Sequence, residues 1–163
     1  MKHQLWMLFS LLAVAVAAAY LGWFRPEPYA VHRFGGFAAI AAALLFAANL
    51  SYAALFQAIK RSPARDLRVR LAKLARKAMP WHIPIGIVGT ALIVMHAGIM
   101  LTQYGLMNVH PKTIAGLASL LLLGLTLGAG VLRTRRASGF RRKFHLTTAF
   151  LFAASFLAHM YLT

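Results

Sequence analysis

Cysteine is absent from this chain of 163 residues, and acidic side chains are nearly absent as well. Without cysteine the chain has no thiolate, which excludes iron–sulfur clusters, thiolate chemistry and covalent c-type haem attachment. Glu27 and Asp66 are the two acidic residues, and they stand against eighteen Lys and Arg for a formal net charge of +16. So basic a chain raises the question of nucleic-acid binding.

The apolar content points instead to a membrane. Hydrophobic residues make up 61% of the chain, whereas soluble domains have about 45–50%. The basic residues lie between long apolar runs, where the orientation rule for membrane helices accounts for them. We therefore predict a membrane protein, with lipid and not nucleic acid as its surroundings.

Five membrane spans follow from the hydropathy pattern. They lie near 5–24, 33–57, 82–103, 113–132 and 144–162. Each is long enough to cross a hydrocarbon core of about 30 Å as a helix rising about 1.5 Å per residue. Stretches this long suit helices and not the short alternating strands of a barrel. The predicted fold class is an all-α, polytopic helical bundle.

The chain is predicted to form one membrane domain over 1–163. Residues 1–31 would hold an extra N-terminal span, 32–163 a four-helix core, and 60–80 a basic cytoplasmic link. The first apolar run follows a basic start, as in a signal peptide. Because it has the ~20 residues of a spanning helix, we expect it to be retained.

The basic residues predict the orientation. The link over 60–80 holds eight Lys and Arg and the link over 133–143 holds six, with Lys2 on the same side. The opposite side holds Arg25, Arg33 and Lys112. Positive loops stay cytoplasmic, so we expect a bacterial inner-membrane protein with its N-terminus in the cytoplasm and its C-terminus outside.

The link over 62–78 is the only extended polar stretch, and its apolar residues recur at helical spacing. These are Leu67, Leu71, Leu74 and Ala78. The pattern is typical of a short helix on the anionic inner leaflet. A solvated loop that is basic only to set the topology is the alternative.

Four histidines in the apolar runs carry the functional signal. His82 and His96 are fourteen residues apart, and so are His145 and His159. Fourteen residues make nearly four helical turns, so each pair shares one helix face with a rise of ~21 Å. Spans three and five run in the same direction, so we expect His82 level with His145 and His96 level with His159.

Two facing pairs of neutral imidazoles at two depths are what two stacked b-type haems require. Imidazoles fill both axial positions of an iron without adding charge to a low-dielectric interior. With both positions filled, outer-sphere electron transfer is the favoured role. Two alternatives stay open: scattered polar residues satisfied within the bundle, and a path for zinc, copper or nickel.

Small and aromatic residues between the histidines are further candidates. Gly86 and Gly89 share the face of His82 and His96 and would let a macrocycle approach the backbone. Phe152 would fill the space between the two haems. Glycine also promotes helix packing in membranes, which is the alternative for these positions.

The two histidine pairs resemble the haem-binding arrangement of the ferric reductase-like transmembrane domain, shared by ferric reductases and NADPH oxidases. They are also similar to the related cytochrome b four-helix core. In the ferric reductase-like proteins the ligands lie on the third and fifth helices, as they do here. The resemblance covers about residues 32–162 and rests on spacing and topology.

The resemblance implies a di-haem conduit, with His82 and His145 on the cytoplasmic-side haem and His96 and His159 on the outer one. Such oxidoreductases usually continue into a sixth helix and a flavin and nicotinamide domain, whereas this chain ends after its fifth span. We therefore expect a separate reductase, a membrane quinol or a partner subunit to supply the electrons.

Cations near the membrane surfaces are candidates to pair with the anionic haem propionates. The inner candidates are Arg76, Lys77, Arg141, Arg142 and Lys143, and the outer ones are Arg33, His32, His110 and Lys112. The alternative is that these residues only set the topology.

The outer link over 102–112 could bind a quinone. Its polar residues are Gln103, Tyr104, Asn108 and His110. An ordinary interfacial loop is the alternative there.

The sequence thus predicts a transmembrane cytochrome that binds two haem b and passes electrons between a cytoplasmic-side or quinol donor and an outer acceptor. One alternative is a haem-bearing, quinone-reactive anchor subunit of a larger redox complex. A non-redox transporter or packing subunit is the other.

Overall fold

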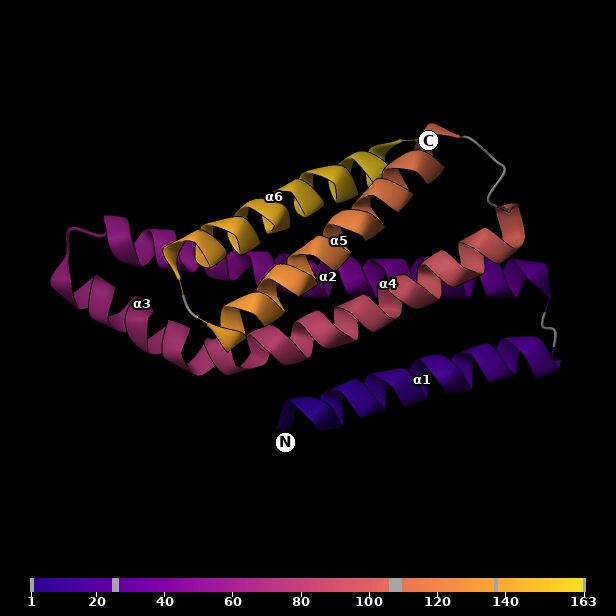
Figure 1. Ribbon diagram of the computed structural model, residues 1–163, viewed down its shortest axis with the longest axis horizontal. Helices are drawn as coiled ribbons and strands as arrows, with labels where there is room; N and C mark the ends of the chain where they lie inside the picture. The colour runs from indigo at the N-terminus through magenta and orange to yellow at the C-terminus, as the bar shows by residue number, and fades with distance from the viewer. Residues whose placement is uncertain (1, 25–26, 106–109, 137, 163) are drawn as a thin grey trace. The chain divides into compact units, whose positions relative to one another are not determined.

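The computed structural model describes residues 2–24, 27–105, 110–136 and 138–162, and all their regular secondary structure is helical. The elements in chain order are α1 (Lys2–Phe24), α2 (Pro28–Arg61), α3 (Arg65–Ala78), the 3₁₀ turn η1 (Met79–Trp81), α4 (His82–Tyr104), α5 (Pro111–Arg135) and α6 (Gly139–Tyr161) (Figure 1).

The all-α fold class is confirmed. Within the described residues, four helical segments are long and apolar enough to cross a membrane, and they contain α2, α4, α5 and α6. The first predicted span coincides with α1, whose apolar helical stretch Met7–Ala17 is shorter than these four. A membrane crossing by α1 therefore remains a prediction.

The chain divides into two compact units, Met1–Gln103 and Tyr104–Thr163. In the first unit α2 and α4 run in opposite directions, and α3 with η1 joins them (Figure 1). Small residues bring α2 close to α4: a Cβ on Gly35 would lie 2.6 Å from Cε of Met100, and one on Gly89 would lie 3.2 Å from Cζ of Phe46. Small residues at membrane helix contacts allow this close approach.

The basic link forms the helix α3, as its periodicity predicts. Residues 62–64 separate it from α2, and Ala75 is buried. Its end is tied to α2, because the Tyr52 hydroxyl donates a hydrogen bond of 2.9 Å to the Ala78 carbonyl. Leu67 and Leu74 stay about half exposed, at 49% and 54%, which leaves the apolar side of α3 available to lipid.

The second unit is an antiparallel hairpin of α5 and α6, drawn in orange and yellow in Figure 1. Ser119 and Thr126 of α5 and Thr148 of α6 are buried. The hydroxyl groups of Ser119 and Ser155 lie 2.9 Å apart and form a hydrogen bond between the helices. Small polar side chains of this kind hold membrane helices together.

The turn between α5 and α6 is closed by side chains. Ser138 is the N-cap of α6 and accepts a hydrogen bond of 3.2 Å from the Arg141 backbone N–H. The Arg141 guanidinium donates to the carbonyls of Leu132, at 2.7 Å, and Arg136, at 3.1 Å. Arginine thus adds a second donor to the Leu132 carbonyl, which also accepts the Arg136 backbone N–H at 3.3 Å, and binds the Arg136 carbonyl just after α5.

Candidate functional site

The four predicted ligands lie on two helices, two in each unit. His82 is the first residue of α4 and His96 lies fourteen residues further along it. His145 and His159 lie on α6. All four are half-buried.

Three of these histidines bond to the backbone of the neighbouring helix. Nδ1 of His96 lies 3.0 Å from the Gly35 carbonyl oxygen of α2. Nδ1 of His145 lies 3.0 Å from the Thr126 carbonyl oxygen of α5. These bonds fix where the rings sit between the helices.

His159 repeats this arrangement at the other end of α5, since its Nδ1 lies 2.8 Å from the Lys112 carbonyl oxygen. A carbonyl oxygen can only accept, so Nδ1 must carry the proton and donate it. In the neutral imidazole the lone pair then lies on the other ring nitrogen, Nε2. This is the tautomer of a metal-ligating imidazole, which usually donates its second N–H to a carbonyl or carboxylate.

His82 is held by different neighbours. Its carbonyl oxygen accepts a hydrogen bond of 3.1 Å from Nδ2 of Asn49 on α2. Its ring meets the Tyr52 ring edge to face, with centroids 5.6 Å apart and planes at 81°. Both neighbours belong to the end of α2 that also supports α3.

The two helix pairs have the same antiparallel register around their histidines. On α2, Gly35 lies opposite His96 and Asn49 lies opposite His82. On α5, Lys112 lies opposite His159 and Thr126 lies opposite His145. The partner residues on α2 and on α5 are therefore also fourteen residues apart. Each unit independently places two half-buried histidines about four helical turns apart.

Glycines on α5 make room for the imidazoles of α6. Gly116 follows Lys112 by four residues, and Gly130 follows Thr126 by four. Helical side chains lean toward the N-terminus, so a side chain at these positions would cover the carbonyl to which the histidine bonds. A Cβ on Gly116 would lie 2.9 Å from Cε1 of His159, and one on Gly130 would lie 3.5 Å from Cε1 of His145.

The sequence prediction missed Gly116 and Gly130. The available signal was their separation of fourteen residues, equal to that of the histidines. Reading that signal requires knowing which residues of α5 face α6. Hydropathy does not provide this for a helix that is apolar around most of its circumference.

Gly86 and Gly89, which were predicted to face a macrocycle, lie against α2. A Cβ on Gly86 would lie 3.3 Å from Nδ2 of Asn49, and the Phe46 ring covers Gly89. This geometry agrees with the helix-packing alternative, and contact with a macrocycle remains a prediction. Phe152 is buried, and its ring lies 5.8 Å from that of Phe156.

The candidate cations differ in their surroundings. The Arg33 guanidinium lies over the rings of Tyr29 and Phe37, at 5.8 Å and 5.7 Å from their centroids. Arg76 borders a groove between α2 and α3. Arg142 is exposed in the first turn of α6. Pairing of these three with haem propionates remains a prediction.

Two other candidate cations take part in helix capping. Arg141 binds carbonyls near the end of α5. His110 is the N-cap of α5, and its Nδ1 accepts a hydrogen bond of 3.3 Å from the Lys112 backbone N–H.

In the outer link, where a quinone site is predicted, Gln103 Nε2 donates a hydrogen bond of 3.4 Å to the Pro28 carbonyl. Asn108 lies outside the described residues, so a quinone site there remains a prediction.

Among the described residues, no group of three or more His, Cys, Asp and Glu side chains could hold a metal ion. A haem iron between two imidazoles takes only two protein ligands, so the haem prediction requires no such group. Pairing of His82 with His145 and of His96 with His159 joins residues of different units and remains a prediction.

Comparisons with family models, with curated proteins and with solved structures find no match.

Proposed function

We propose that the chain is a di-haem b-type cytochrome that passes electrons across a bacterial cytoplasmic membrane. His82 and His145 would hold the cytoplasmic-side haem, and His96 and His159 the outer one. The observation that carries the proposal is the hydrogen bonding of His96, His145 and His159, each of which donates from Nδ1 to a backbone carbonyl. A neutral imidazole that donates from Nδ1 carries its lone pair on Nε2, the nitrogen that would bind iron.

The composition of the helices supports haem over a bare metal ion. The only acidic residues of the chain are Glu27 and Asp66, and cysteine is absent. Structural and catalytic metal sites usually combine histidine with thiolate or carboxylate ligands. Neutral imidazoles in a membrane interior suit a haem, whose propionates can reach cations near the surface.

The bound haem would supply one-electron chemistry through its iron. The chain would hold the imidazoles in one tautomer, separate the two sites by about four helical turns and surround them with apolar side chains. With two imidazoles holding each iron, no position would be open to a substrate, which would favour electron transfer over substrate binding. The resemblance of the histidine spacing to the ferric reductase-like domain agrees with this role.

The experiment is a dithionite-reduced minus oxidised visible spectrum of the purified protein, with a pyridine-haemochrome count of haem per chain. We expect two b-type haems. Single His82→Leu, His96→Leu, His145→Leu and His159→Leu variants should each lose one haem, and His110→Asn should keep both because asparagine also serves as an N-cap.

The pairing has its own test in these variants. His96→Leu and His159→Leu should remove the same haem, identified by its midpoint potential and its low-spin electron paramagnetic resonance signal. His82→Leu and His145→Leu should remove the other. Loss of different haems by His96→Leu and His159→Leu would refute the pairing. A colourless protein from haem-sufficient cells would refute the cytochrome and leave the transporter or packing subunit.

A further inference from the structure

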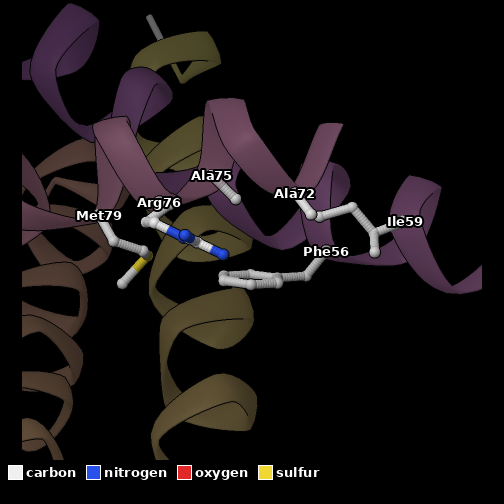
Figure 2. Close-up of a pocket in the computed structure, with 6 residues that line it drawn as sticks. All are labelled: Phe56, Ile59, Ala72, Ala75, Arg76 and Met79. Atoms are coloured by element: carbon white, nitrogen blue, oxygen red, sulfur yellow. The ribbon is translucent and has the colours of Figure 1, made fainter. Parts of the chain in front are cut away.

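A groove lies between the last two turns of α2 and the second half of α3, within the first unit (Figure 2). Its volume is about 280 Å³. The lining residues are Phe56, Ile59, Ala72, Ala75, Arg76 and Met79. Five of the six are apolar, and the sixth contributes a long aliphatic stem below its guanidinium.

Small side chains on α3 keep the groove open. Ala72 and Ala75 are three residues apart and face α2 together, since side chains at this spacing share one helix face. The Tyr52 hydroxyl, bound to the Ala78 carbonyl, holds the end of α3 against α2. The two helices that form the groove are thus held together at both ends, by residues 62–64 at one end and by the Tyr52–Ala78 hydrogen bond at the other.

The charge around the groove is mostly positive. The exposed basic residues of α3 are Arg65, Arg68, Arg70, Lys73, Arg76 and Lys77, against the single acid Asp66. Lys60 and Arg61 end α2 beside them. Figure 2 shows the Arg76 side chain running along the groove toward the Phe56 ring, so a cation stands directly over an apolar floor.

We infer that this groove binds one anionic glycerophospholipid, with its phosphate on Arg76 and part of an acyl chain between Phe56, Ile59 and Ala72. The groove lies where a membrane-long apolar helix becomes polar, which is the depth of lipid headgroups. A water-soluble ligand would need several polar groups to orient it, and among the lining residues only Arg76 offers one. The basic surroundings favour an anionic headgroup over a zwitterionic one.

The inference does not depend on haem. Arg76 was predicted to pair with a haem propionate, and its position on the groove makes a lipid phosphate a second candidate partner. The two roles are distinguishable, because lipid bound per chain and haem bound per chain are measured separately. The lipid count alone decides the present inference.

The test uses the full-length protein, delipidated in a neutral detergent and titrated with phosphatidylglycerol under native mass spectrometry. We expect one phosphatidylglycerol to bind more tightly than all others. Ala72→Phe fills the groove and should abolish this tight site. Ile59→Trp fills it from the other wall, which keeps the test valid should either variant fail to fold.

Charge is tested separately. Arg76→Gln should weaken the tight site about fivefold, the effect of one basic residue at an anionic surface. Lys73→Gln is the matched control, because Lys73 is exposed on the same helix and does not line the groove; it should weaken binding less than Arg76→Gln does. Phosphatidylcholine and inorganic phosphate should not occupy the site.

Three results would overturn the inference. Wild-type binding by a folded groove-filling variant would remove the groove from the site. Equal weakening by Arg76→Gln and Lys73→Gln would reduce the effect to the general charge of α3. Equal binding of phosphatidylcholine would show that the headgroup charge is not recognised.

Discussion

At the scale of single residues, the candidate site depends on which nitrogen of each imidazole carries a proton. His96, His145 and His159 each donate from Nδ1 to a backbone carbonyl. A backbone acceptor is not removed by substituting its own residue, so the bonds of His159 and His145 do not depend directly on the side chains of Lys112 and Thr126. Gly35 differs, because a Cβ there would lie 2.6 Å from Cε of Met100 and would disturb the contact between α2 and α4. The side chain four residues after the carbonyl is the more sensitive position, because it covers that oxygen.

Gly116→Ala and Gly130→Ala form a matched pair that tests whether a Cβ four residues after the carbonyl disturbs the histidine bonded to it. The new Cβ at position 116 would lie 2.9 Å from Cε1 of His159, so the ring must move away from the Lys112 carbonyl. At position 130 the separation from Cε1 of His145 is 3.5 Å, an ordinary contact. We expect Gly116→Ala to weaken binding of the His96–His159 haem about 10–100-fold, the usual effect of disturbing a ligand's hydrogen-bond partner.

The haem affinity of both variants is measured by titration with a haem-scavenging apoprotein, as the haem that each chain retains. Gly130→Ala should behave as the wild type does. If the two variants lose haem equally, or if neither does, the glycine at position 116 has no role in setting the His159 ring.

At the scale of helices, hydropathy predicted where the spans lie but not where the helices end. The predicted span 33–57 becomes α2, Pro28–Arg61, and 113–132 becomes α5, Pro111–Arg135. Both helices begin at a proline, Pro28 in α2 and Pro111 in α5, a residue favoured in the first turn. His110 also caps α5 with its side chain, whereas Glu27 makes no side-chain capping bond to α2. Polar residues in the terminal turns lower the average hydropathy without breaking the helix. A span predicted from hydropathy is therefore shorter than the helix.

The contacts between helices were harder to predict from the sequence. The fourteen-residue spacing of the histidines was visible, and so was the helical nature of the basic link. The antiparallel register that sets His145 opposite Thr126 was not, because it depends on packing along the whole hairpin. The contact between the Phe46 ring and Gly89 could not be predicted either, because a glycine in the sequence does not indicate which side chain packs against it.

The α5–α6 hairpin makes a prediction about packing. Ser119 is 5% exposed and bonds to Ser155, whereas its neighbour Ala118 is exposed. Ser119→Leu should destabilise the protein by about 1–3 kcal/mol through overpacking, and Ala118→Leu on the outer face should change stability little. Thermal unfolding of the two purified variants, followed by circular dichroism, compares them. Equal melting temperatures would mean that Ser119 does not lie in a tight helix contact.

At the scale of the whole molecule, the distribution of charge predicts the orientation. The links over 60–80 and 133–143 carry most of the basic residues, which should keep both in the cytoplasm. The absence of cysteine makes this directly testable, because a single introduced cysteine is the only thiol of the chain.

We expect Ala64→Cys to be protected from a membrane-impermeant maleimide in intact cells and to react once the membrane is opened. Tyr104→Cys should react in both conditions. Both positions are exposed in the structure, so accessibility to solvent does not distinguish them. Reaction of Ala64→Cys in intact cells would reverse the predicted orientation.

The bonds from histidine to backbone also bear on how a cofactor would be acquired. A ring that already donates to a carbonyl has lost its rotational freedom during folding, before any ligand arrives. The entropy of ordering His96, His145 and His159 is therefore a cost of folding and not of binding. Preorganised rings of this kind favour capture of a cofactor by a folded apoprotein, in contrast to a chain that must collapse around it.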